Sequence, residues 1–191
     1  MSSNGEVWLR TVPDDKGRFH AELSFGDDLA VTLTPALAGR WAAAVLMAVS
    51  QAEHDAAIRL QILDVLTEDF EGDREAAAAE TIGDVRAARQ PIGWPTRIPA
   101  KLEPGVGVDS GKPFLHLWVK PNPGANGWEP IGQWSVEDAR GHALAVLEVA
   151  AVAELDTSYR NVMVLRFGVD PERALNVVGA LGQYRVDKTR G

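Results

Sequence analysis

The sequence of 191 residues contains no cysteine, no long apolar run and no run of basic residues. Without cysteine the chain forms neither disulfides nor a thiolate metal site, which agrees with a reducing compartment. The longest apolar run, Trp41–Val49, falls far short of the roughly 20 residues that a membrane-spanning helix needs. The first ten residues also lack the basic and apolar segments of a secretory signal. We therefore expect a cytoplasmic protein that does not bind membranes.

Positive charge is scarce in the first half of the chain. Residues 1–90 carry 16 acidic and 8 basic side chains, residues 91–191 carry 11 of each, and the formal net charge is −8. Because clustered lysine and arginine supply most of the affinity of proteins for phosphate backbones, we do not expect a nucleic-acid partner. Abundant alanine, valine, aspartate and arginine beside only five lysines favours a GC-rich bacterial or phage genome.

The sequence also lacks the local motifs of common catalytic sites. It contains no G-x-S-x-G, G-x-x-x-x-G-K-[ST] or H-E-x-x-H pattern, and its four histidines are scattered. Asp138 and His142 are four apart on an expected helix and could share a proton or a metal ion, but ordinary side-chain pairs at this spacing are far more common. We therefore assign no catalytic residue, no metal and no cofactor, and favour a non-enzymatic function.

A segment near the start of the chain recurs about a hundred residues later. Aligned without gaps at an offset of 101, residues 34–59 and 135–160 share nine identities in 26 positions. A segment with strand-like alternation precedes each copy, at residues 12–23 and 108–119. The pattern predicts an internal tandem duplication.

Each copy is predicted to contain three strands, a helix, a fourth strand and a second helix, in the order βββαβα. The fourth strands are expected at the apolar runs Ile58–Leu63 and Val162–Phe167. The second helices are expected to begin after acidic caps at Asp73 and Asp170. The predicted fold is therefore α+β, with antiparallel-rich sheets backed by helices. Because one copy alone is too small for a secure core, we expect a compact pseudo-twofold unit.

A segment rich in proline and glycine, Arg89–Gly105, separates the two copies. Its composition is typical of a linker, and it has neither a helical nor a strand period. The predicted organisation is a first repeat at residues 1–90, a linker at 91–105 and a second repeat at 106–191.

Both repeated helices carry a stripe of small apolar residues and a start signal. We expect the stripes to be buried, because small side chains let another element approach closely. Thr34 before Pro35, and Ser135 three residues before Asp138, are typical of helix starts. The stripes consist of Ala38, Ala42, Val45, Val49 and Ala52 in the first copy and of Ala139, Ala143, Val146, Ala150 and Ala153 in the second.

Two acids and an arginine recur in both copies at the expected junction between the first helix and the fourth strand. One interpretation places them around a ligand pocket at the seam between the copies. The other, which we favour, is structural, since an acid and an arginine that bridge a tight turn would be retained in both copies. The residues are Glu53, Asp55 and Arg59 in the first copy and Glu154, Asp156 and Arg160 in the second.

The clearest difference between the copies is a long loop within Lys120–Trp134, KPNPGANGWEPIGQW, which replaces a short connection. Tryptophans beside glycine and proline are candidate anchors for a partner, although they are also common lids over a core. The candidate binding residues are Trp128, with Asn126 and Glu129 beside it, Trp134, and Trp94 in the linker.

These observations favour a non-enzymatic binding or adaptor protein, monomeric or homodimeric, whose partner is another protein. The alternative is a small-ligand-binding protein, or less readily an enzyme, with a pocket at the seam between the copies.

Overall fold

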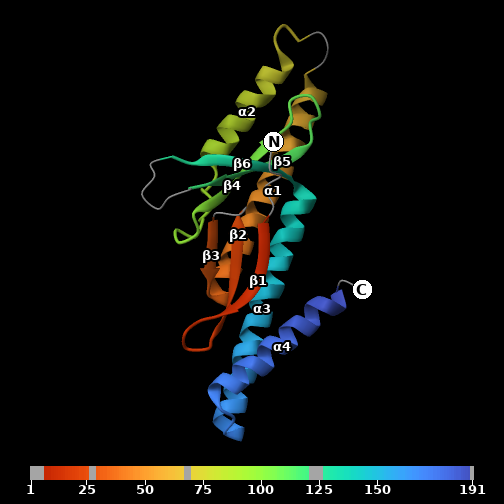
Figure 1. Cartoon of the computed structure of the whole chain (residues 1–191). Helices are drawn as coiled ribbons and strands as arrows, with labels where there is room; N and C mark the ends of the chain where they lie inside the picture. Colours follow the sequence, from red (N-terminus) through yellow and green to blue (C-terminus); the bar gives the residue numbers. More distant parts are fainter. Residues whose placement is uncertain (1–6, 26–28, 67–69, 121–126, 190–191) are drawn as a thin grey trace. The chain divides into compact units, whose positions relative to one another are not determined.

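The computed structural model describes residues 7–25, 29–66, 70–120 and 127–189 (Figure 1). Three strands and two helices are followed by three more strands and two more helices, so the chain is an α+β protein. The elements are β1 (Val7–Pro13), β2 (Phe19–Phe25), β3 (Leu29–Leu33), α1 (Pro35–Val65), α2 (Arg74–Ala88), β4 (Ala100–Val106), β5 (Pro113–Val119), β6 (Glu129–Ser135), α3 (Val136–Phe167) and α4 (Pro171–Thr189). Across the described residues, none of these helices combines the length and apolar character needed to cross a membrane.

Each half of the chain forms a three-stranded antiparallel sheet. The strand orders are β1-β2-β3 and β4-β5-β6, so neighbours in the chain are also neighbours in the sheet. Leu23 of β2 pairs with Leu9 and Val31, and Leu117 of β5 pairs with Leu102. Alternate residues of the two central strands are buried: Phe19, Ala21, Leu23 and Phe25 in β2, and Leu115, Leu117 and Val119 in β5. The alternation seen in the sequence is therefore confirmed as strand.

The predicted fourth strands are wrong. Ile58–Leu63 belongs to α1, and Val162–Phe167 belongs to α3, so each half has the order βββαα. Once a helix has formed, each added residue gains a hydrogen bond without a new nucleation cost, and no glycine or proline interrupts either helix at these runs. The α3 helix ends only at Gly168, where φ is +64° and alanine or larger residues would be strained.

The predicted linker is wrong in its last part, which forms a strand. Residues 100–105 lie in β4, where Leu102 is buried and pairs with Leu117 of β5. The sequence did not predict this strand because it contains Pro104 and Gly105, and both residue types are typical of turns. The predicted division of the chain into repeats at residues 1–90 and 106–191 stays a prediction.

The helix starts lie where the sequence predicts them. Thr34 Oγ1 accepts a hydrogen bond from the backbone N–H of Leu37 (3.3 Å), and Ser135 Oγ accepts one from that of Asp138 (3.0 Å). Asp73 caps α2, and Asp170 accepts from two backbone N–H groups of α4. All ten residues of the two predicted small-residue stripes are buried. Local signals thus fix where each helix begins and which side it buries.

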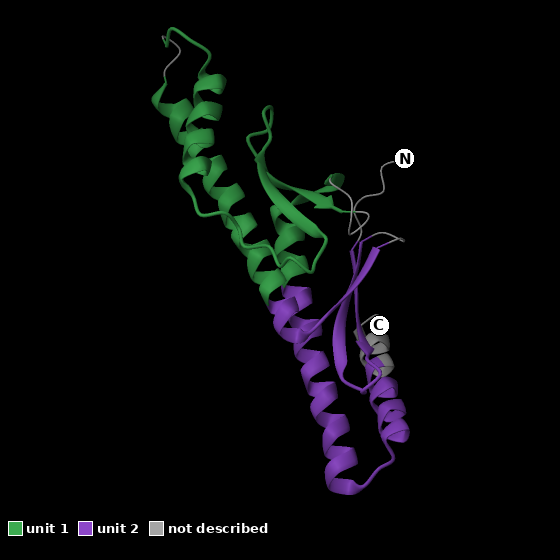
Figure 2. Ribbon diagram, turned by 90° about the vertical axis from the view of Figure 1, so that its left-hand side faces the viewer, with its two compact units in different colours: residues 1–6, 40–143 green, residues 7–39, 144–191 purple. Residues whose placement is uncertain are grey.

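The chain divides into two units, each of which takes its sheet from one half of the sequence and most of its helices from the other (Figure 2). The first unit, Arg40–Ala143, contains most of α1, all of α2 and the sheet β4-β5-β6. The second unit, Val7–Gly39 with Leu144–Gly191, contains the sheet β1-β2-β3, most of α3 and α4. The boundary between the units therefore falls within α1 and within α3.

In the second unit, β2 packs against α3 and α4. Phe19, Ala153 and Val178 form a buried cluster, with Met163 and Leu175 packed against it. The backbone N–H of Phe19 donates a hydrogen bond to Thr157 Oγ1 (2.9 Å), which attaches the start of β2 to α3. The core of this unit thus depends on residues far apart in the sequence.

Candidate binding site

The recurring acid Asp55 is fully buried inside the first unit. It lies in the middle of α1, and two arginines at the end of α2 reach it. Arg86 Nε lies 2.7 Å from Oδ2 of Asp55, and Arg89 Nη1 lies 2.6 Å from Oδ1. A buried carboxylate that is paired with two guanidinium groups holds α1 and α2 together. Asp55 therefore has a structural role in this arrangement.

Glu53 and Arg59 make separate contacts within the first unit. Glu53 Oε1 lies 2.9 Å from Arg140 Nη2 on the surface. Arg59 donates to Glu75 through Nε (3.0 Å) and Nη2 (2.6 Å), and Nη2 also donates to the carbonyl oxygen of Val108 (2.8 Å). The predicted junction between helix and strand is not there, because all three residues lie within α1.

The second set, Glu154, Asp156 and Arg160, lies within α3 in the second unit. Asp156 is 2% exposed and Asp55 is 0% exposed, and in the described part of the chain they are the two buried charged residues. Glu154, like Glu53, is exposed. In both halves of the chain, the recurring aspartate is therefore buried on the packed side of a helix. A ligand pocket at the seam stays a prediction.

The recurring arginines both pack against the hairpin turn of the sheet in their own unit. Arg160 lies against Gly17 of the β1–β2 turn, and Arg59 lies against Gly111 of the β4–β5 turn. The two glycines have φ angles of +69° and +64°. A Cβ atom at either position would overlap the arginine side chain. The close approach of a guanidinium group to a turn thus explains both the arginine and the glycine in each copy.

Gly17→Ala and Gly111→Ala are each expected to lower the free energy of unfolding by about 1–3 kcal/mol, because positive φ strains alanine and the new methyl group meets an arginine. Gly179→Ala in α4 is the matched control. Its Cβ position is open and alanine favours helix, so stability should stay equal or rise. Urea unfolding measures all three variants. Wild-type stability in the first two would contradict the packing.

Trp94 and Trp134 belong to an aromatic cluster with Trp41 and His142 in the first unit. Trp41 is fully buried, and its ring centroid lies 5.1 Å from that of Trp94. The Trp134 ring lies 4.9 Å from the His142 ring. This packing is typical of a lid over a core. A role of Trp94 and Trp134 in binding a partner stays a prediction.

His142 and Asp138 have separate partners, although the sequence placed them four apart on one helix. Trp41 Nε1 donates a hydrogen bond to His142 Nε2 (3.1 Å). Asp138 Oδ2 instead accepts from Ser135 Oγ (2.8 Å) at the start of α3. Burial lowers the pKa of His142 from 6.5 to about 4, so the ring is neutral at pH 7 and its Nε2 lone pair is available to Trp41.

The stability of the protein is expected to fall between pH 6.5 and pH 4 through His142. The unfolded chain binds a proton at this residue near pH 6.5, whereas the folded chain does so only near pH 4. Unfolding is therefore favoured as the pH falls through this window. His142→Gln keeps an acceptor for Trp41 without a titrating ring, and should show a weaker dependence in urea unfolding at pH 7, 6 and 5. Identical slopes for the two proteins would contradict this role.

Trp128 lies between two lysines in the first unit. Lys101 Nζ is 4.9 Å and Lys120 Nζ is 5.1 Å from the centre of its ring. The indole is partly buried, and Glu129 beside it is exposed. The third predicted residue, Asn126, lies outside the described residues. Cations over the ring hold the indole in place and leave part of it accessible. Its contribution to a binding surface stays a prediction.

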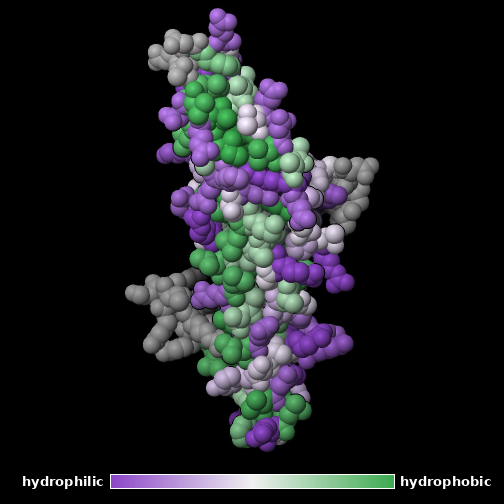
Figure 3. All heavy atoms as spheres, turned by 180° about the vertical axis from the view of Figure 1, so that it is seen from behind, coloured by the Kyte–Doolittle hydropathy of each residue, from purple (hydrophilic) through white to green (hydrophobic). Residues whose placement is uncertain are grey.

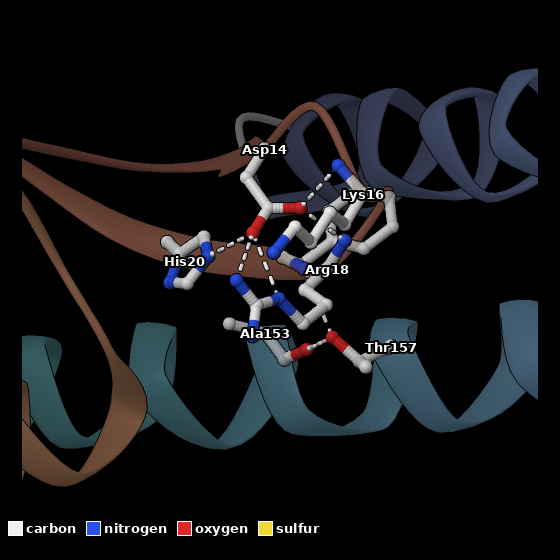
Figure 4. Close-up of polar contacts among 7 residues, drawn as sticks. Asp14, Lys16, Arg18, His20, Ala153 and Thr157 are labelled. Atoms are coloured by element: carbon white, nitrogen blue, oxygen red, sulfur yellow. Dashed lines mark hydrogen bonds and ion pairs between the residues drawn. The ribbon is translucent and has the colours of Figure 1, made fainter.

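A dense polar cluster lies at the β1–β2 turn of the second unit (Figure 4). Asp14 Oδ1 accepts from the backbone N–H groups of Lys16 (3.0 Å) and Arg18 (2.8 Å). Asp14 Oδ2 lies 2.8 Å from Arg18 Nε and 3.1 Å from His20 Nε2. Partial burial raises the pKa of Asp14, but the hydrogen bonds from Arg18 and His20 outweigh it and hold that pKa well below the usual range. The cluster stabilises the turn that contacts Arg160.

A groove of about 590 Å³ opens in the first unit between α2 and the β4–β5 hairpin. Ala76, Ala79 and Ile82 form its wall on α2, and Pro104, Val106 and Phe114 form the wall on the hairpin. The Phe114 ring lies across Gly105, where a Cβ atom would overlap it, so the ring reaches the β4 side of the groove. The groove thus joins segments from both halves of the sequence.

Most of the charged side chains at this groove are already paired within the first unit. Arg59 binds Glu75, Arg86 binds Asp55, and Glu103 Oε1 lies 2.5 Å from Lys101 Nζ. A charged ligand would have to compete with these pairs, and breaking a partly buried pair is costly. Asp73, which caps α2, and His116 also line the groove. The rest of the lining is apolar or glycine, so the groove suits apolar groups within a polar rim.

Within the described residues, no group of three or more His, Cys, Asp or Glu side chains is placed to hold a metal ion. Comparison of the chain with protein-family models, with curated proteins and with solved structures finds no match. The conclusions about function therefore depend on the residues of this chain alone.

The sequence did not point to the groove. Two signals were present: the run of four alanines in REAAAAE on α2, and the Pro-Gly pair in what became β4. Small side chains leave space at the surface of a helix or strand, but a groove forms only where two such elements face each other. These two segments lie about thirty residues apart, and no local period relates them.

Proposed function

We propose that this chain is a non-enzymatic protein-binding module whose groove receives an extended, apolar segment of a partner protein. The observation that carries this proposal is the groove itself, with apolar residues on both walls and mostly paired charges around it. Apolar burial within a polar rim is the usual anatomy of protein interfaces. Because the rim charges already have partners, the expected segment carries few charges of its own.

The scaffold of this module is proposed to be a tandem duplication. Both halves have the order βββαα and contain a buried aspartate, and the arginine of each half packs against a positive-φ glycine of the other half. Shared features of this kind are expected when two copies diverge in function but keep the demands of folding. The pseudo-twofold arrangement and the bacterial or phage origin expected from the sequence stay predictions.

The groove is tested by filling it. Ala79→Trp places a large side chain on an exposed position of α2 that lines the groove, whereas Ala87→Trp, the matched control, places it on an exposed position of α2 outside the lining. Peptides selected by display against the wild-type chain are titrated against both variants by calorimetry. We expect apolar peptides whose affinity falls at least tenfold, about 1.4 kcal/mol, in Ala79→Trp alone. Failure to select a peptide, or equal loss in both variants, would contradict the proposal.

Trp128 is proposed as a second contact for the partner, together with Asn126 and Glu129. The loop that carries it has no counterpart in the first half, so the common fold does not require it. Trp128→Ala should weaken binding of the selected peptides or of the native partner with little change in melting temperature. A large loss of stability, or unchanged binding, would leave Trp128 as packing against Lys101 and Lys120.

The second candidate function is binding of a small apolar ligand in the same groove. Its volume of about 590 Å³ lies within the range of small-molecule sites. A thermal-shift screen separates the two functions, since a ligand at a hundredfold excess over its Kd stabilises by roughly 2.7 kcal/mol. A small-molecule hit that Ala79→Trp abolishes, without any peptide binder, would favour this alternative.

A further inference from the structure

One face of α3 carries large apolar side chains that are exposed. Leu155 is 60% exposed, Tyr159 61% and Leu165 82%. We call the full set the α3 stripe: Leu144, Leu147, Leu155, Tyr159, Val162 and Leu165. These residues are spaced so that they share one side of the helix, opposite the buried small residues. Apolar side chains gather along α3 in the lower part of Figure 3.

The α3 stripe is too long to be incidental. From Leu144 to Leu165 it extends about 32 Å at the 1.5 Å rise of an α-helix. Single exposed apolar residues are normal on a protein surface, but six of them on one face of a helix are typical of an interaction site.

The fold does not require apolar residues at all six positions of this face. The α1 helix also buries a small-residue stripe, yet only three of the six positions equivalent to the α3 stripe are apolar on α1, namely Ala43, Leu46 and Ile58. At the offset of 101 residues, Leu155 corresponds to His54, Val162 to Gln61 and Leu165 to Asp64. The apolar character of Leu155, Val162 and Leu165 is therefore specific to α3 and is not required by the shared order of elements.

Two opposite charges lie on the same face of α3 as the α3 stripe. Glu148 and Arg166 are eighteen residues apart, which is five full turns, so they lie on the same side of the helix. Both are exposed, and neither forms an ion pair with another described residue. Two parallel copies of α3 would place like charges together. Two antiparallel copies would place Glu148 of each copy near Arg166 of the other.

One register satisfies both the charges and the apolar contacts. Residue 157 is the midpoint between Glu148 and Arg166, and it is also the midpoint between Leu155 and Tyr159. An antiparallel pair centred there joins Leu155 of each copy to Tyr159 of the other, with an ion pair on either side. This self-complementarity is what a twofold interface needs.

We propose that the α3 stripe binds a second copy of this chain, as an antiparallel homodimer centred at residue 157. The groove belongs to the first unit and the stripe to the second, so this proposal stands independently of the peptide-binding function. The groove is lined by none of the stripe residues.

The first experiment measures the mass of the full chain by sedimentation velocity from 1 to 100 µM. We expect a dimer in the wild type, and a loss of dimer affinity of at least tenfold in Leu155→Glu, because the new carboxylate would be buried against apolar groups. Gln61→Glu, at the position of α1 equivalent to Val162, is the matched control and should dimerise normally. Circular dichroism checks that every variant remains folded. A wild type that is monomeric throughout, or a dimer unaffected by Leu155→Glu, overturns the proposal.

The second experiment tests the antiparallel register by charge reversal. Glu148→Arg and Arg166→Glu should each weaken the dimer, because each creates two repulsive contacts between the copies. The double variant should restore wild-type affinity, since both ion pairs re-form with their signs exchanged. In a parallel pair each single reversal would only exchange one like-charge contact for another. Failure of the double variant to recover would therefore overturn the antiparallel dimer.

Discussion

Val45→Asp and Val146→Asp should each lower the free energy of unfolding by about 4 kcal/mol or more, because a carboxylate without a partner is buried in an apolar core. Val45 in the first unit and Val146 in the second are both 0% exposed. Loss of this size is a large share of the stability of an ordinary domain, so partial or complete unfolding is expected. Urea and thermal unfolding, followed by circular dichroism, measure the effect.

Two controls separate buried charge from other consequences of these substitutions. Val45→Thr keeps the side-chain shape and exchanges one methyl group for a hydroxyl group, so it should cost about 1–3 kcal/mol. Met47→Asp, at a 48% exposed position on the same helix, should cost less than about 1 kcal/mol. The loss in Val45→Asp should also shrink as the pH falls, because a protonated carboxyl group costs less to bury. Wild-type melting temperatures for both aspartate variants would show that the stripes do not form the core.

Replacement of both Arg86 and Arg89 by methionine should destabilise the first unit by about 3–5 kcal/mol, since Asp55 would stay buried without a counter-charge. Asp55→Ala should cost less than the double arginine variant. The Arg86 side chain is 42% exposed, so this cation can turn to water once its partner is gone. A larger loss of stability in the double arginine variant than in Asp55→Ala is the result that identifies Asp55 as a buried carboxylate. Urea unfolding measures it.

The triple variant with Asp55→Leu, Arg86→Met and Arg89→Met tests the same interpretation. Because no charge remains to be buried, it should recover much of the stability lost in the double variant. Arg10→Met is the surface control: Arg10 lies 2.6 Å from Glu22 but is 72% exposed, so less than about 1 kcal/mol is expected. A double variant as stable as Arg10→Met would mean that Asp55 is reached by water or by other cations.

Local patterns in the sequence predicted the elements that local forces decide. The alternation at Phe19–Phe25 is a strand, and the caps at Asp73 and Asp170 begin helices. These signals act over a few residues, through side-chain period and through hydrogen bonds to free backbone N–H groups. The predicted strands at Ile58–Leu63 and Val162–Phe167 failed because apolar runs of that length suit either structure, and the preceding helix simply continued.

The candidate site depended more on tertiary contacts. The sequence singled out Asp55 and Arg59 by their recurrence, but their partners, Arg86 and Glu75, lie 31 and 16 residues away. Recurrence alone therefore favoured a structural pair over a ligand pocket but did not identify the partners. The aromatic cluster around Trp41 and His142 joins residues 101 apart, and no local pattern predicts that contact.

The sequence by itself determined the central strand and the helix starts in each half, the buried side of the two long helices α1 and α3, and the absence of thiolate chemistry. Only the tertiary structure decided which helices cover which sheet. Each unit combines the sheet of one half with helices of the other, and the groove between α2 and the β4–β5 hairpin exists because of that exchange. The physical reason is that the two halves carry nearly the same apolar pattern, so a helix from either half can bury its stripe on either sheet. Periodicity describes the face that must be buried, and the choice of the partner depends on long-range packing.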